Sequence, residues 1–220
     1  MPVEKSLSPW APMQKIGSLL KAGEYFRLVH LAVKNVVPAT LFQINRHYYY
    51  RCPATAGRYR ALTRTAVREA THADLDLLLT CHGDRRDFSR RFREGDRCFI
   101  ALADGICAAT LWFKTADRFH SVSGYTFTPE QAGTLLYDAY TLPAYRAKGL
   151  YIALLQALYH DLPDLASKNL YGEIHYENTQ SLALFNRLKC PIMQRVVTVS
   201  ILGLRIFFVK HFAPPARPRA

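Results

Sequence analysis

The chain has 220 residues, of which 50% are hydrophobic and 21% are charged, so its composition excludes an intrinsically disordered protein. A formal net charge of +12 favours anionic partners such as nucleic acid, acidic lipid or a phosphorylated cofactor. The five cysteines form no C-x-x-C pair, which argues against a disulfide framework and a zinc site, and we expect no bound metal. No secretory signal or membrane-spanning run is recognisable, and we therefore expect a cytoplasmic protein.

Residues 1–61 are predicted to form a basic, amphipathic helical extension. Apolar residues recur every three or four positions from Leu19 to Val36, which places them on one face of a helix that stops at Pro38. Such a helix can lie at an anionic membrane surface, here through residues 15–51 at the inner face of the membrane. It can equally pack against the rest of the chain, or against a second subunit in a homodimer.

Strands and helices alternate from residue 62 to residue 212, and a Pro/Arg-rich tail at 213–220 is expected to be disordered. The strand "RTAVREA" precedes a helix that opens with a capping box of Thr71 and Asp74. After an Arg-rich helix, a hairpin turns at Asp104-Gly105. The remaining pattern is strand "TLLYDAYTL", a leucine-striped helix, strand "NLYGEIHY", helix "TQSLALFNRL" and two strands about Gly203. This order predicts a mixed α/β domain.

The loop "PAYRAKGLY" joins a strand to a helix and has the composition of a phosphate site. A helix N-terminus presents N–H groups without intrahelical partners and a partial positive charge. Gly149 allows the main chain to approach a ligand closely, and Arg146 and Lys148 add full charges. The alternative is a solvated loop whose basic side chains face water.

This loop resembles the pyrophosphate-binding motif of the GNAT superfamily of acyl-CoA-dependent N-acyltransferases, [RQ]-x-x-G-x-[GA]. Arg146 and Gly149 match it, while Tyr151 replaces the usual small residue. The second family signature has an Asn, a small residue three positions on and an aromatic seven positions on, as in "NTQSLALF" from Asn178. The resemblance covers about residues 65–202 and implies a mostly antiparallel, twisted mixed sheet flanked by helices.

The resemblance further implies acyl-CoA or acetyl-CoA as the co-substrate. The diphosphate would bind the turn, and the pantetheine arm would enter a V-shaped gap where "YTL" splays from "LYGEIHY". Asn178 would contact the pantetheine, although it could instead cap the helix that begins at Thr179. The cofactor-binding residues implied in this way are Tyr140, Thr141, Leu142, Arg146, Ala147, Lys148, Gly149, Leu150, Tyr151, Asn178 and Ser181.

Family members need a base for the amine and often use a tyrosine as the acid for the leaving thiolate, at the position that Phe185 occupies here. Phenylalanine cannot donate a proton, so either another residue is the acid or the thiolate leaves unprotonated. Tyr151 is our hypothesis for the acid, ahead of Tyr140, Tyr176 and Cys190. Candidates for the base lie on the two strands that frame the gap, and for each a structural role is the alternative: Asp138, Glu173 and His175.

The acceptor amine is predicted from composition and charge, since no motif in the sequence specifies it. The basic extension favours an amphipathic or membrane-proximal amine, such as a long-chain base. The alternatives are a soluble amino sugar, nucleotide sugar or amino acid, and a non-catalytic CoA-binding scaffold, for which Phe185 and Tyr151 argue. A nucleic-acid partner is disfavoured, because the arginines between residues 85 and 97 alternate with acidic residues.

Overall fold

A computed structural model describes residues 24–26, 28–30, 37–38, 41–52, 65–83, 87–116, 118–121, 124–129, 133–162 and 169–212. The chain divides into a smaller unit, residues 1–46 with 197–208, and a larger unit, residues 47–196 with 209–220. Strands β1, β9 and β10 have residues in both units.

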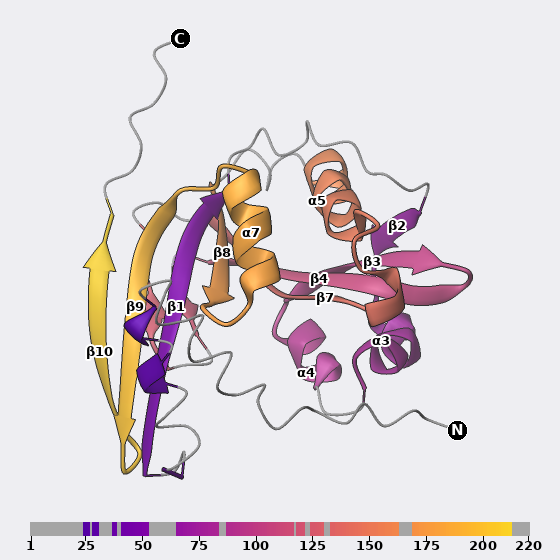
Figure 1. Cartoon of the computed structure of the whole chain (residues 1–220). Helices are drawn as coiled ribbons and strands as arrows, with labels where there is room; N and C mark the ends of the chain where they lie inside the picture. Colours follow the sequence, from indigo (N-terminus) through magenta and orange to yellow (C-terminus); the bar gives the residue numbers. More distant parts are fainter. Residues whose placement is uncertain are drawn as a thin grey trace, which may run out of the picture. The chain divides into compact units, whose positions relative to one another are not determined.

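One eight-stranded sheet has the order β10-β9-β1-β8-β7-β4-β3-β2 (Figure 1). Its strands are β1 (Phe42–Cys52), β2 (Ala66–Glu69), β3 (Arg97–Ala103), β4 (Ile106–Ala116), β7 (Gly133–Thr141), β8 (Asn169–His175), β9 (Ile192–Ile201) and β10 (Leu204–His211). The pair β7–β8 is parallel, whereas β1–β8, β2–β3, β3–β4 and β4–β7 are antiparallel. Strands β5 (Phe119–His120) and β6 (Thr126–Phe127) form a separate small hairpin.

Helices cover both faces of the sheet in the larger unit (Figure 1). They are η2 (His72–Asp74), α3 (Leu75–His82), α4 (Phe88–Arg93), η3 (Pro143–Tyr145), α5 (Leu150–Asp161) and α7 (Thr179–Arg187). Leu111 and Phe113 of β4 pack with α5 and α7, while Trp112 between them packs with α3 and α4. This alternation along one strand produces two hydrophobic cores, one on each side of the sheet. The predicted mixed α/β fold is therefore confirmed.

The segment 42–52 corrects the predicted helical extension, because it is strand β1 rather than helix. Residues 47–52 pair antiparallel with residues 170–175 of β8. Tyr48, Tyr49 and Tyr50 are consecutive aromatic residues, which favour a pleated strand. Tyr48 and Tyr50 pack on one face of the sheet and Tyr49 packs on the other. Of the helix predicted upstream, residues 25, 26 and 28–30 are described and are helical. The remainder of that helix, residues 53–61 of the predicted extension and the tail at 213–220 lie outside the described residues.

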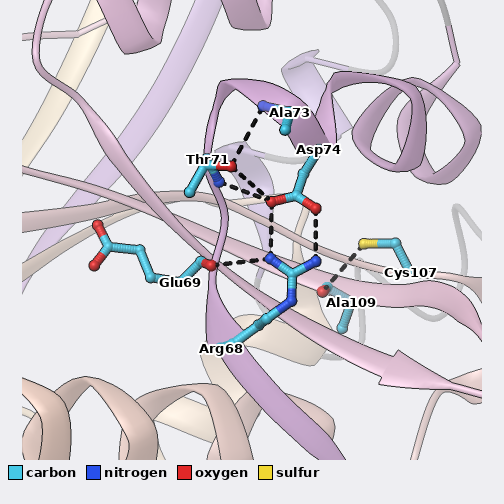
Figure 2. Close-up of polar contacts among 7 residues, drawn as sticks. All are labelled: Arg68, Glu69, Thr71, Ala73, Asp74, Cys107 and Ala109. Atoms are coloured by element: carbon cyan, nitrogen blue, oxygen red, sulfur yellow. Dashed lines mark hydrogen bonds and ion pairs between the residues drawn. The ribbon is translucent and has the colours of Figure 1, made fainter.

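The capping box predicted at Thr71 and Asp74 is present, and it also ties strand β2 to the helix (Figure 2). The Asp74 carboxylate accepts hydrogen bonds from both terminal nitrogens of Arg68, at 2.8 and 2.6 Å, and from the Thr71 N–H at 2.8 Å. The Arg68 hydrogen bond is the chief cause that lowers the pKa of Asp74 to about 2. The carboxylate therefore stays charged and fixes the start of α3.

All five cysteines are free and buried. In the described part of the chain, no three or more His, Cys, Asp or Glu side chains gather closely enough to hold a metal ion. No helix among the described residues has the length and hydropathy needed to cross a membrane.

Strands β7 and β8 pair only over their first halves and then part. Residues 133–136 of β7 register with residues 169–172 of β8. From Glu173 onward β8 pairs only with β1, where Glu173 faces Tyr49. Strand β7 also contains one extra residue opposite β4, because Thr110 faces Tyr140 whereas Trp112 faces Tyr137. Asp138 lies in this bulge with a φ of 45°.

Phe185 of α7 packs directly on the place where the strands part. A Cβ added at Gly172 would lie 2.8 Å from the Phe185 Cε1 atom, so only glycine fits beneath the ring. The phenyl ring is buried and lies 5.3 Å from the ring of Tyr50. The position therefore accommodates an apolar aromatic side chain as part of the core.

We expect Gly172→Ala to lower the free energy of unfolding by about 1 to 3 kcal/mol, because the new methyl overpacks the Phe185 ring. Chemical denaturation would measure the loss. In a second variant, Phe185→Leu in the Gly172→Ala background should recover part of it. Strictly additive losses for the two changes would contradict the contact.

Candidate active site

The turn before α5 has the backbone geometry of an anion site. Gly149 is the N-cap of α5 with a φ of 77°, and Ala147 has a φ of 62°. The Ala153 N–H donates to the Gly149 carbonyl oxygen at 3.1 Å, so the N–H groups of residues 150–152 precede the helical hydrogen-bond ladder. These N–H groups lie at the positive end of the helix dipole.

Two basic side chains project from this turn. Arg146 and Lys148 are both exposed; the Arg146 Nε donates to the Thr141 carbonyl oxygen at 3.2 Å, and the Lys148 Nζ lies 4.6 Å from the Tyr145 ring centroid. Upstream, Tyr140 pairs with β4, and β8 no longer pairs with β7 at this level. The predicted cofactor residues 140–151 thus form one continuous segment along the diverging part of β7 and into α5.

Asn178 has the alternative role that the sequence left open. Its Oδ1 accepts a hydrogen bond from the Ser181 N–H at 3.1 Å, which makes it the N-cap of α7. This contact accounts for Asn178 and Ser181 without a ligand.

Tyr151 lies on the apolar side of the sheet. Its ring centroid is 6.2 Å from that of Phe185, and it packs against the core that α5 and α7 cover. Burial raises the pKa of the Tyr151 phenol well above its ordinary value. Since Glu173 and Ile174 are neighbours on β8 and Ile174 belongs to this core, Tyr151 and Glu173 are on opposite faces of the sheet.

A polar cluster occupies that second face, where β1 and β8 run side by side. Glu173 is opposite Tyr49 in the ladder, and His175 is opposite His47. The Ser121 hydroxyl donates to the Glu173 Oε1 at 2.5 Å, and the His47 Nε2 lies 3.9 Å from the same oxygen. The Glu173 side chain is only 13% exposed, so its carboxylate is held among protein groups.

The small β5–β6 hairpin brings Ser121 to this place. Phe127 of β6 stacks on Tyr49 with ring centroids 4.5 Å apart, and it meets the Tyr171 ring at 5.5 Å. Tyr125, in the same segment, donates from its hydroxyl to the Gln194 Oε1 at 3.0 Å. The aromatic contacts fix the hairpin over β1 and β8, and the hairpin in turn positions the Ser121 hydroxyl on Glu173.

Burial raises the pKa of Glu173, while the Ser121 hydrogen bond, the Tyr49 hydroxyl and the Lys114 charge oppose that rise. Burial and the neighbouring His175 lower the pKa of His47 to about 4, so this imidazole is neutral at physiological pH. Neutral His47 cannot compensate the carboxylate charge. Glu173 is therefore a largely buried carboxylate with a raised pKa, and a raised pKa makes a carboxylate a stronger proton acceptor.

Asp138 and His175, the other candidates for the base, have different surroundings. The Asp138 Oδ2 accepts from the Arg91 Nη1 at 2.7 Å, and the Arg91 guanidinium lies 4.9 Å from the Trp112 ring centroid. This ion pair gives Asp138 a structural role in tying the β7 bulge to α4. The His175 ring contacts His47 at 4.9 Å, and its Nδ1 lies 3.8 Å from the Glu177 Oε2.

Ser121, Tyr49 and His47 were not among the residues predicted for the site. Ser121 is 52 residues from Glu173 in a segment without a clear periodic pattern, and no local signal connects the two. His47 and Tyr49 share a strand face by the period of two, as do Glu173 and His175. A strand prediction for "RHYYY" would have placed His47 and Tyr49 on one face of the sheet.

The model of the acetyltransferase (GNAT) family matches residues 59–189, more than half of the chain, and the chain belongs to this family. None of the curated proteins compared matches it significantly.

Several solved structures are similar to this chain at low sequence identity. A functionally unknown conserved protein from Staphylococcus epidermidis is 10% identical with a TM-score of 0.54, and the match covers 76% of this chain but only 64% of that protein. The aminoglycoside 6′-N-acetyltransferase AAC(6′)-Ig from Acinetobacter haemolyticus is 16% identical with a TM-score of 0.44, covering 56% of this chain and 88% of its own. The corresponding enzyme AAC(6′)-Ih from Acinetobacter baumannii is 17% identical with a TM-score of 0.43, over 56% and 88%.

We expect Ser121→Ala to raise the pKa of Glu173 further, because the hydrogen bond that stabilises the carboxylate is removed. The carbon-13 shift of the labelled glutamate carboxyl, followed against pH, would measure the change. Ser89→Ala on α4 is the control and should leave that titration unchanged. Equal titrations for the wild type and Ser121→Ala would show that the hydroxyl does not support the carboxylate.

Proposed function

We propose that the chain is an acyl-CoA-dependent N-acyltransferase that moves an acyl group from acyl-CoA or acetyl-CoA to a primary amine, with Glu173 as the general base. One observation carries the proposal. A turn with Gly149 in the left-handed conformation opens α5 after β7, and a largely buried carboxylate follows on β8 immediately after the two strands part. Membership of the acetyltransferase (GNAT) family supports the same activity.

In this proposal the diphosphate of CoA binds the N–H groups and basic side chains of residues 146–151. The pantetheine arm lies along residues 140–142, where β7 has no pairing to β8. The thioester then enters between the diverging strands and approaches Glu173. The transfer is direct and uses no metal ion.

Glu173 accepts the proton that the acceptor ammonium must lose, directly or through one water molecule. The neutral amine attacks the thioester carbonyl carbon, a C–N bond forms, and the tetrahedral intermediate collapses with cleavage of the C–S bond. Because burial raises the pKa of Glu173, its carboxylate is a stronger base than an exposed glutamate.

The departing thiolate needs no dedicated tyrosine in this scheme. Phe185 offers no proton, and Tyr151 is on the opposite face of the sheet from Glu173. A thiol has a pKa of about 8.5, so its thiolate is a tolerable leaving group near neutral pH, and it takes up, through water, the second proton that the attacking nitrogen loses as the amide forms.

For the acceptor, we propose an amphipathic or membrane-proximal amine, such as a long-chain base. Exposed large apolar side chains of the smaller unit, including Tyr25, Val29 and Leu41, support a contact with amphipathic molecules. A soluble amino sugar, nucleotide sugar or amino acid is the second candidate. The hydrogen-bonding side chains of Tyr125 and Gln194, in the same unit as Glu173, favour such a polar acceptor.

Gly149→Glu should abolish CoA binding, because a carboxylate at the turn repels the diphosphate and a side chain is strained at a φ of 77°. Isothermal titration with CoA would measure the affinity. Gly95→Glu is a matched control, since Gly95 has a φ of 82° and open space around it. If both variants bind CoA like the wild type, the turn does not hold the diphosphate.

Glu173→Gln should lower kcat by roughly 10²- to 10⁴-fold, while the affinity for CoA stays the same, because only the base is lost.

Wild-type activity should fall as the pH drops through the raised pKa of Glu173, since the protonated acid cannot accept the amine proton. Steady-state kinetics across pH would test both. Glu177→Gln, an exposed carboxylate on the same segment, is the control, and equal kcat for Glu173→Gln and this control would exclude Glu173 as the base.

A further inference from the structure

A tight turn joins β9 to β10 (Figure 1). Apolar side chains in and beside this turn are exposed. Leu202 and Gly203 form the turn, and Leu202 and Leu204 are 72% and 75% exposed. Ile201 and Ile206, on either side, are also exposed. We call these four residues, Ile201, Leu202, Leu204 and Ile206, the apolar tip; all of them belong to the smaller unit.

Leucine is a poor choice for the conformation that this turn requires. Leu202 has a φ of 51° and Gly203 a φ of 84°, the left-handed pair of a two-residue hairpin turn. Asparagine or glycine is favoured at the first of these positions, and a left-handed conformation is unfavourable for leucine. The exposed Leu202 side chain therefore adds little to the stability of the turn.

One backbone N–H of the apolar tip is already paired. The Leu202 N–H donates to the Leu41 carbonyl oxygen at 2.9 Å, and Leu41 itself is exposed beside the tip. Entry into an apolar medium would thus not leave this N–H without a hydrogen-bond partner. An unpaired backbone group is the main cost of placing irregular backbone in such a medium.

A positive charge adjoins the apolar tip, because Arg205 lies between Leu204 and Ile206. The sequence of residues 1–46 and 197–208 contains seven lysines and arginines and two glutamates, of which Glu24, Arg46 and Arg205 are among the described residues. Apolar side chains with adjacent positive charge match the acyl boundary and headgroups of an anionic bilayer. A stable contact with a second copy needs about 20 to 30 residues on each side, many more than a hairpin turn provides.

We propose that the apolar tip inserts into the interfacial region of an anionic phospholipid bilayer. Binding at the tip requires neither acyl-CoA nor Glu173, so the inference goes beyond the proposed acyl transfer and does not depend on it. Where both hold, the enzyme would meet an amine acceptor that partitions into lipid.

The experiment is flotation of the full chain with vesicles of phosphatidylcholine alone, or of phosphatidylcholine with an equal amount of phosphatidylglycerol. We expect binding to the mixed vesicles, and at least a roughly tenfold weaker partition for the double variant Leu202→Asn/Leu204→Asn. Asparagine is favoured at the left-handed position, so the melting temperature should not fall through the change at Leu202. Ile106→Asn is the matched control, since Ile106 is an exposed apolar residue next to the Asp104-Gly105 turn, and it should float like the wild type.

Three results would overturn the inference: no flotation of the wild type with the mixed vesicles, equal flotation of the wild type and the double variant, or equal loss for Ile106→Asn. Sedimentation without lipid adds a fourth, because a wild-type dimer that the double variant converts to a monomer would make the tip a contact between copies. CoA titration of the same samples separates the two proposals. Flotation without CoA binding would contradict the acyl transfer alone, and CoA binding without flotation would contradict the tip alone.

Discussion

The point at which β7 and β8 stop pairing is the constraint on which the site depends. Up to Leu136 and Gly172 the strands share a parallel register, and beyond it β7 stays paired only with β4 and β8 only with β1. Phe185 fills the space beneath Gly172, and the Arg91–Asp138 ion pair holds the β7 bulge on the other side. These contacts on the two faces of the sheet keep β7 and β8 apart beyond Gly172. The next residue of β8 is Glu173, so its carboxylate lies directly after the last residue that pairs with β7.

The two faces of the diverging strands are chemically different. One is apolar and includes Phe185 and Tyr151, while the other holds Glu173 with Ser121 and His47. Tyr151, the predicted acid, and Glu173, a predicted base, therefore lie on different faces of the sheet. The arrangement favours a mechanism in which the carboxylate handles the amine proton and the thiolate departs without help from an aromatic hydroxyl.

Local features of the fold could be predicted from sequence, and long-range ones could not. The Thr71–Asp74 capping box, the Asp104-Gly105 turn and the glycine before α5 are all set by residues within a few positions of each other. The contacts that define the candidate site join Ser121 to Glu173 and Tyr49 to Glu173 across the sheet. They depend on strand register and on the packing of the β5–β6 hairpin, neither of which a single sequence reveals.

Strand β1 lies inside the sheet, between β9 and β8. The family match begins at residue 59, after β1 has ended at Cys52. A chain cut to the limits of that match, residues 59–189, would lack β1 together with β9 and β10, and the freed side of β8 would be an open edge of the kind that recruits other chains. The part of the sequence by which the family is recognised is thus shorter than the part that completes its sheet.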